Sequence, residues 1–264
     1  MKLCYLGISC LDVDDAVNKF LTLYSFERYG CIEARDGSNS EVMRHGGIFV
    51  ILKKAINSVV DSIDDIAFCV NSLHDICEKI AQFGSVIVQK PCAEDCNTYS
   101  SRCDPCKNCL NDSGDCLYSV EKAVIKSSVG NLKHTLIEKC EGFSGNFLPG
   151  FVRYPDWNEA VYGEAVKFNC IDHIALAVPC SETLNHISWY KNCLEMSKFN
   201  CNKLEKEDGL IIKARQGRGL KLFTLALHPC SERGVTTEEK EVGNNNINFV
   251  FCESLTEQGI LLSI

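Results

Sequence analysis

The sequence predicts an α+β fold built from repeated strand–helix–three-strand (βαβββ) modules, and three observations support this prediction. The eight residues 63–70 recur at 171–178 with five identical positions. Apolar residues at helical spacing follow both copies, and short extended segments follow both helical patterns. A module of this kind leaves one apolar sheet face uncovered when it is alone, so the modules are expected to pair.

The three modules begin near residues 3, 63 and 171, and the first is the most weakly marked. The expected first strands cover 3–11, 63–70 and 171–178. The expected helices cover 13–23, 72–80 and 182–194. The extended pieces that complete each module cover 27–34, 40–44 and 47–52, then 86–89, 123–127 and 135–138, then 196–200, 210–214 and 220–225.

The pairing of modules predicts the domain organisation. Modules one and two are expected to form an N-terminal domain over 1–144, joined by a linker over 145–167 to a C-terminal domain over 168–264. Because 94 residues remain after Cys170, we expect the C-terminal pair of modules to be incomplete. Residues 247–255 are one more strand, which ends the third module or opens a fourth, and no further helix or strand is expected after it.

Composition and charge exclude several classes of protein. With 264 residues and 45% hydrophobic content, the chain can bury a sizeable core. A net charge of −8 and a pI near 5.3 argue against a nucleic-acid partner, because phosphate binding needs clustered Lys and Arg. No apolar run approaches the roughly 20 residues of a membrane-spanning helix. The N-terminus carries no signal or transit pattern, so we expect a soluble intracellular protein.

Most of the 18 cysteines stand singly among apolar residues, which is typical of a reducing compartment. The segment 91–116 differs, because it carries six cysteines in a polar insertion: Cys92, Cys96, Cys103, Cys106, Cys109 and Cys116. The C-x-x-C-x-x-C spacing within it suits thiolate ligands of a metal. No second C-x-x-C lies at a zinc-ribbon distance, so the insertion is interpreted as a loop with free thiols.

Three segments resemble the end of the N-terminal domain and the linker of 4-hydroxyphenylpyruvate dioxygenases, namely Ala123–Gly130, His134–Lys139 and Gly145–Phe151. Residues 63–70 and 171–174 match the same family in order and spacing. The resemblance covers nearly the whole chain except 91–116. It implies the paired βαβββ architecture of the vicinal-oxygen-chelate superfamily.

The resemblance also implies a mononuclear non-haem Fe(II) enzyme. Such an enzyme uses O₂ to decarboxylate an aromatic 2-oxo acid, here 4-hydroxyphenylpyruvate or a relative, and to hydroxylate the product. Two histidines and one carboxylate leave three positions on the metal open for the oxo acid and O₂. Dioxygenase-like members of the family imply a mitochondrial location and formation of 4-hydroxymandelate for the coenzyme Q headgroup.

Carrying the family's site over assigns one metal ligand, His173, in the first strand of the third module. Asp65 takes the equivalent place in the repeat, so only the C-terminal half is expected to bind iron. The family's second histidine and its carboxylate lie in a fourth module, so the Fe(II) site is expected to be incomplete in this chain and the chain inactive as a short form. If 247–249 matched 171–173, Phe249 would take the ligand position.

No motif assigns a role to the other five histidines. His186 and His228 match no pattern of the family, and His45, His74 and His134 suit exposed or strand-end positions of the N-terminal half. Two other functions stay open beside an oxygenase. One is a non-catalytic protein that binds partners through its N-terminal half. The other is a glyoxalase-like enzyme, which would want Glu or His at Asp65. The sequence assigns no catalytic residue and no oligomeric state.

Overall fold

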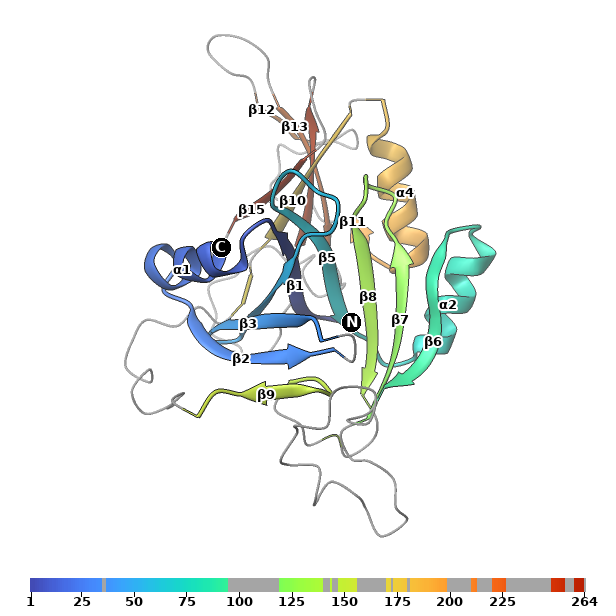
Figure 1. The fold of residues 1–264 in the computed structure, drawn as a ribbon. Coiled ribbons are helices and arrows are strands. Elements are labelled where there is room, and N and C mark those ends of the chain that lie inside the picture. The colour runs from blue at the N-terminus through green and yellow to red at the C-terminus, as the bar shows by residue number, and fades with distance from the viewer. Residues whose placement is uncertain are drawn as a thin grey trace, which may run out of the picture.

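A computed structural model describes the chain in twelve segments that together form two curved sheets and three helices (Figure 1). The described residues are 1–34, 37–94, 119–139, 143, 147–155, 170–171, 173–179, 181–198, 210–212, 220–226, 248–254 and 259–263. No helix in these segments is long and apolar enough to cross a membrane.

The first module is present as predicted, with its first and last strands side by side. It consists of β1 (Lys2–Cys10), α1 (Val13–Leu23), β2 (Glu27–Glu33), β3 (Asn39–His45) and β4 (Ile48–Lys54). β1 pairs with β4 in parallel. Asp12 starts the helix, because its carboxylate accepts a hydrogen bond from the Asp15 N–H at 3.0 Å and satisfies one of the free donors of the first turn.

The second module repeats this arrangement and completes the N-terminal half. It consists of β5 (Ser62–Cys69), α2 (Leu73–Gln82), β6 (Ile87–Glu94), β7 (Val120–Lys126) and β8 (Lys133–Lys139), with β5 parallel to β8. β1 and β5 pair antiparallel and join the two modules into one sheet. The order of its nine strands is β6-β7-β8-β5-β1-β4-β3-β2-β9.

Part of the segment expected as a linker belongs to this sheet. β9 (Phe151–Arg153) pairs antiparallel with β2 at its edge, so that Cys31 lies opposite Val152. The ring of Phe151 stacks on Tyr29 with centroids 4.9 Å apart. Gly30 permits this close approach, since a methyl group there would lie 2.2 Å from the Val152 carbonyl oxygen and 2.6 Å from the Phe151 ring.

We therefore expect Gly30→Ala to displace β9 and to lower the free energy of unfolding by about 2 kcal/mol, the cost of forcing a methyl group into a filled space. Urea unfolding followed by tyrosine fluorescence measures the change, and Cys31→Ala, at the next and half-buried position, is the control. Equal midpoints for the two variants would show that β9 contributes nothing to stability.

The third module forms the second sheet, and the pairing of its last strand shows whether residues 247–255 end this module or open a fourth. It consists of β10 (His173–Pro179), α4 (Thr183–Cys193), β11 (Ser197–Lys198), β12 (Leu210–Ile212), β13 (Leu220–Ala226) and β14 (Asn248–Ser254). β10 pairs with β14 in parallel, as β1 pairs with β4. β14 therefore ends the third module, and the alternative that placed Phe249 at a ligand position is wrong.

One further strand, which the sequence did not predict, follows β14. β15 (Gly259–Ser263) pairs antiparallel with β10, in the same relation that β5 has to β1. The sequence of 259–263, GILLS, is apolar but has neither alternation nor a turn signal before it, so its length alone could not identify a strand. The expectation that no strand follows residue 255 is wrong.

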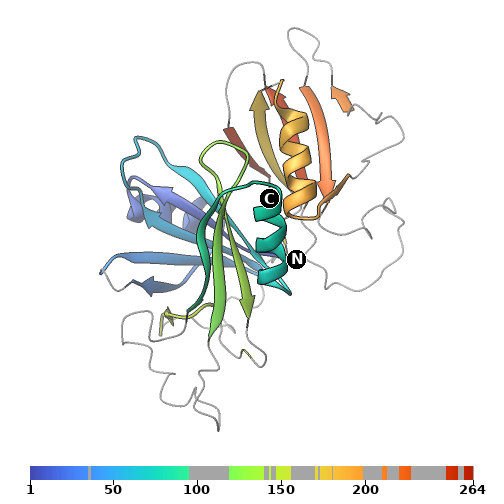
Figure 2. The same cartoon turned by 90° about the vertical axis from the view of Figure 1, so that its right-hand side faces the viewer.

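The two sheets share one hydrophobic core across the helix α4. A first cluster of buried side chains combines residues of both halves, among them Leu6, Phe68, Ile174 and Tyr190. A second cluster fills the inside of the N-terminal sheet and includes Tyr5, Tyr29, Phe147 and Phe151. Figure 2 shows α2 and α4 in contact, and an ion pair between Lys79 and Glu195 joins their two C-terminal ends.

Candidate functional site

The predicted metal ligand His173 is the first residue of β10 and is half-buried. The strand register sets two residues directly beside it, Asn248 on β14 and Ser263 on β15. Neither is a histidine or a carboxylate, the donors that an Fe(II) site of the expected kind requires. The rigid strand is a suitable mount for a ligand, but these two register partners add no second ligand of that kind.

Two of the remaining described histidines, His186 and His45, have hydrogen-bond partners in the N-terminal half. His186 on α4 is buried and bonds to the Ser128 hydroxyl at 3.1 Å, while His45 at the end of β3 bonds to the Ser25 carbonyl at 2.8 Å. His74 is exposed on α2. Within the described segments no three His, Cys, Asp or Glu side chains come together as a metal site would require. The donor set in this part of the chain does not fit Fe(II), and His228 lies outside it.

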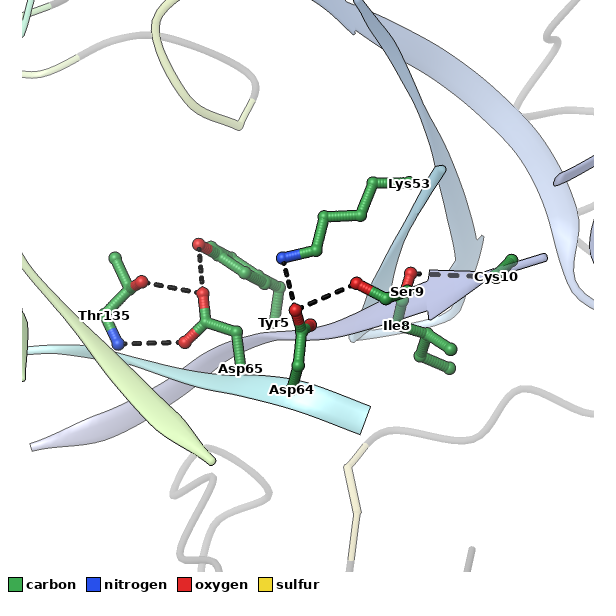
Figure 3. Close-up of polar contacts among 8 residues, drawn as sticks. All are labelled: Tyr5, Ile8, Ser9, Cys10, Lys53, Asp64, Asp65 and Thr135. Carbon is green, nitrogen blue, oxygen red and sulfur yellow. Dashed lines mark hydrogen bonds and ion pairs between the residues drawn. The ribbon is translucent and has the colours of Figure 1, made fainter. Parts of the chain in front are cut away.

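Asp65, the counterpart of His173 in the repeat, is buried inside the N-terminal sheet and bonded on both oxygens (Figure 3). Its Oδ1 accepts from the Thr135 N–H at 3.0 Å. Its Oδ2 accepts from the Thr135 hydroxyl at 2.7 Å and from the Tyr5 hydroxyl at 3.0 Å. The carboxylate thus ties β5 to β8 and β1, and a metal ion would have to displace these bonds. This geometry counts against the glyoxalase-like alternative.

Burial raises the pKa of Asp65, and the hydrogen bonds from Thr135 and Tyr5 counteract part of that rise. The pKa of Tyr5 is also raised well above its ordinary value, first by burial and then by the nearby Asp65 charge. The hydroxyl therefore keeps its proton and remains a donor to the carboxylate. Sequence reasoning marked Asp65 as a lost ligand but had no signal for its partners Tyr5 and Thr135, which the repeat does not single out.

The adjacent Asp64 is the extra residue of a bulge in β5, because the register passes from Gly7 opposite Asp65 to Ile8 opposite Ile63, and it borders a groove. Its carboxylate pairs with Lys53 at 3.0 Å and accepts from the Ser9 hydroxyl at 2.9 Å (Figure 3). The other carboxylate oxygen is buried without a hydrogen-bond partner. The groove encloses about 660 Å³ between the end of β1, the loop before β5 and the turn between β7 and β8, and its polar lining includes Asp61, Ser62 and Asn131.

A second buried polar group joins the N-terminal half to α4. His134 lies one residue inside β8 and is completely buried, not exposed. Its Nδ1 donates to the Ile66 carbonyl at 3.0 Å, so its Nε2 accepts from the Tyr190 hydroxyl at 2.9 Å. The Ser127 hydroxyl continues this row of hydrogen bonds, since its oxygen lies 2.9 Å from the Tyr190 hydroxyl oxygen. Burial lowers the pKa of His134 to about 4, which keeps the ring neutral at physiological pH.

The cysteine-rich insertion falls almost wholly outside the described segments. Cys92 lies on β6, where it accepts a hydrogen bond from the Gln89 amide at 2.9 Å. Cys96, Cys103, Cys106, Cys109 and Cys116 belong to 95–118, which the structure does not describe. The interpretation of this segment as a loop with free thiols stays a prediction.

The sequence is similar to curated 4-hydroxyphenylpyruvate dioxygenases over half of its length. It is 28% identical to the enzyme of Xenopus tropicalis over 142 residues, which are 53% of this chain and 30% of the relative. It is 27% identical to the enzyme of Neurospora crassa over 139 residues, 53% of this chain and 29% of the relative. The matched region thus spans less than a third of these relatives. No protein-family model matches the chain.

Solved structures extend the similarity of fold to nearly the whole chain. A mutant of 4-hydroxymandelate synthase from Streptomyces coelicolor superposes with a TM-score of 0.62 and 14% identity, over 96% of this chain and 62% of that one. A fusion protein of a xylose isomerase-like TIM barrel and 4-hydroxyphenylpyruvate dioxygenase superposes with a TM-score of 0.57 and 13% identity, over 99% of this chain and 35% of that one. The chain is thus similar in sequence to 4-hydroxyphenylpyruvate dioxygenases over about half of its length, and it shares the fold of a 4-hydroxymandelate synthase.

Proposed function

We propose that this chain is an oxygenase-type protein whose lineage acts on 4-hydroxyphenylpyruvate or a related aromatic 2-oxo acid with Fe(II) and O₂. His173 carries the proposal, because it stands on the first strand of the third module, where the resemblance places a metal ligand. The similarity to curated 4-hydroxyphenylpyruvate dioxygenases and the fold shared with a 4-hydroxymandelate synthase support it. Formation of 4-hydroxymandelate for coenzyme Q synthesis, in mitochondria, is part of the same proposal.

We also propose that the chain does not turn over this substrate by itself. The register brings Asn248 and Ser263 to His173, and neither supplies the imidazole or carboxylate that a 2-His-1-carboxylate site needs. A single imidazole binds Fe(II) weakly and leaves its orientation undefined, since affinity and geometry come from the complete set of ligands and their hydrogen bonds.

The test compares oxygen uptake by the 264-residue chain, by its His173→Ala variant and by a full-length 4-hydroxyphenylpyruvate dioxygenase, each with 4-hydroxyphenylpyruvate and excess Fe(II). We expect the chain and the variant to consume oxygen equally slowly, at the rate of free iron, while the full-length enzyme turns over. Iron retained after desalting should likewise be equal in the chain and the variant. Uptake by the chain that disappears in His173→Ala would contradict the proposal.

The groove beside Asp64 favours a second candidate function, the binding of a small molecule by the N-terminal half without catalysis. Its volume of about 660 Å³ lies in the range of small-molecule sites, and its lining combines apolar Ile8 and Val129 with polar Asp61 and Asn131. Titration calorimetry with 4-hydroxyphenylpyruvate and 4-hydroxymandelate in a metal chelator tests it. Binding that Asn131→Leu abolishes would favour this candidate, and absence of heat would exclude it for these ligands.

A further inference from the structure

An extra residue in β1 turns Cys4 toward the inside of the N-terminal sheet. The register against β5 passes from Leu3, opposite Phe68, to Tyr5, opposite Ala67, so Cys4 is the extra residue of a bulge. The packing agrees with this, because Leu3 and Leu6 contact the first hydrophobic cluster, whereas the two residues between them, Cys4 and Tyr5, contact the second. In a regular strand consecutive side chains would point to opposite faces.

Cys69 lies on the same face of the neighbouring strand. Along β5 it alternates with Ala67, which belongs to the second cluster, and its direct partner across the strands is Lys2. Cys4 follows Lys2 by two residues on β1, so Cys4 and Cys69 occupy diagonal positions on the same face of two neighbouring strands, and a hydrogen bond between their thiols contributes to both pKa values. Both residues are half-buried. Neighbouring antiparallel strands can bring two cysteines to the separation that a disulfide requires.

The surroundings make the two thiols unequal. The pKa of Cys69 is lowered to about 7 by the hydrogen bond from Cys4 and by the positive charges of Lys139 and Lys2, against the effect of burial. The pKa of Cys4 is raised well above its ordinary value by the same hydrogen bond and by burial, with Asp65 adding to the rise. As the pH rises through neutrality Cys69 therefore loses its proton first, while Cys4 keeps its proton.

We propose that Cys4 and Cys69 form a dithiol site that a hydroperoxide oxidises to a disulfide. The Cys69 sulfur attacks one peroxide oxygen, so that an S–O bond forms, the O–O bond breaks and the leaving oxygen departs as water after taking a proton. The Cys4 sulfur then attacks the oxidised Cys69 sulfur, forms the S–S bond and releases the second oxygen as water. Two thiols and one hydrogen peroxide thus give one disulfide and two waters.

Four other described cysteines lack this combination. Burial raises the pKa of Cys77 and Cys193, and it raises the pKa of Cys10 to about 11. Cys31 is half-buried like Cys69, but burial raises its pKa too. A thiol that keeps its proton at neutral pH reacts slowly with peroxides, because the thiolate is the nucleophile. Among these five thiols, reaction should therefore begin at Cys69.

The experiment treats the reduced 264-residue chain at pH 7 with equimolar hydrogen peroxide, blocks remaining thiols with N-ethylmaleimide and maps tryptic peptides by tandem mass spectrometry. We expect a cross-linked peptide pair joining Cys4 to Cys69. In parallel, iodoacetamide should alkylate Cys69 at least about fivefold faster than Cys31. That ratio follows from the thiolate fraction at pH 7, reduced by the lower nucleophilicity of a less basic thiolate.

Two serine variants and one matched control complete the test. Cys4→Ser should abolish the cross-link and leave Cys69 as a sulfenic acid that dimedone traps, whereas Cys69→Ser should abolish both products. Cys10→Ser removes the other thiol of the tryptic peptide that contains Cys4, residues 3–19, and should leave the cross-link intact. Equal alkylation of Cys69 and Cys31, or a peroxide-treated wild-type chain without the Cys4–Cys69 cross-link, would overturn the proposal, and neither measurement depends on a variant that folds.

Discussion

Replacing Asp65 with alanine should lower the free energy of unfolding by about 3 kcal/mol. The substitution leaves the Tyr5 hydroxyl, the Thr135 hydroxyl and the Thr135 N–H without their shared acceptor inside the N-terminal sheet. A buried donor without a partner costs about 1–3 kcal/mol, and part of that total is returned because burial disfavours the charged carboxylate. Chemical denaturation at pH 7 measures the loss.

Asp65→Asn separates the role of the hydrogen bonds from that of the charge. The amide oxygen can still accept from the Thr135 N–H, and the two hydroxyls can rotate to accept from the amide nitrogen. We expect this variant to lose less than about 1 kcal/mol, since it removes a charge that burial disfavours. If Asp65→Asn were as unstable as Asp65→Ala, the negative charge itself would hold the three strands together.

Acidification from pH 7 to pH 4.5 should lower the free energy of unfolding by about 2 kcal/mol through His134 alone. The pKa of His134 falls from 6.5 to about 4 on folding because the ring is buried. In the unfolded chain the ring takes up a proton as the pH falls below 6.5, whereas in the folded chain it does so only near pH 4. The unfolded state thus binds more protons in this window. The contribution of His134 to the free energy of unfolding is therefore fully present above pH 6.5 and is lost as the pH falls towards 4.

His134→Gln is the matched variant, because glutamine can donate to the Ile66 carbonyl and accept from the Tyr190 hydroxyl but does not titrate. Urea unfolding at a series of pH values should show a shallower slope for the variant than for the wild type between pH 4.5 and 6.5. Burial also lowers the pKa of His186, but that residue is unchanged in both proteins. Parallel slopes would show that His134 titrates normally in the folded chain.

The sequence predicted the modules because their signals are local. The repeat of 63–70 at 171–178 and the apolar spacing of the helices are visible along the chain, and β1, β5 and β10 lie where these patterns placed them. The strand β15 and the inclusion of β9 in the sheet were missed, since both depend on pairing with distant strands. Pairing across the chain is decided by packing and register, which local patterns do not report.

At the candidate site, too, the sequence predicted some features, and contacts between distant residues decided the others. His173 could be proposed from the family resemblance, and the structure puts it at the start of β10, but only the register shows that Asn248 and Ser263 stand beside it. The buried bonds of Asp65 join residues 60 and 70 positions apart, and His134 meets Tyr190 across 56 positions. No spacing rule covers such distances, so these groups could be recognised only in three dimensions.

The parallel pairing of the first and last strands of each module also sets when that module can fold during synthesis. The first module can close once β4 has left the ribosome, but the second must wait from β5 to β8, over residues 62–139. At a synthesis rate of about 5–20 residues per second this wait lasts about 4–15 s, and the segment 95–118, which has no counterpart in the first module, contributes nearly a third of it. During that time β8 does not yet cover the apolar side of β5 and α2, so we expect the insertion to prolong the exposure of apolar surface in the nascent second module.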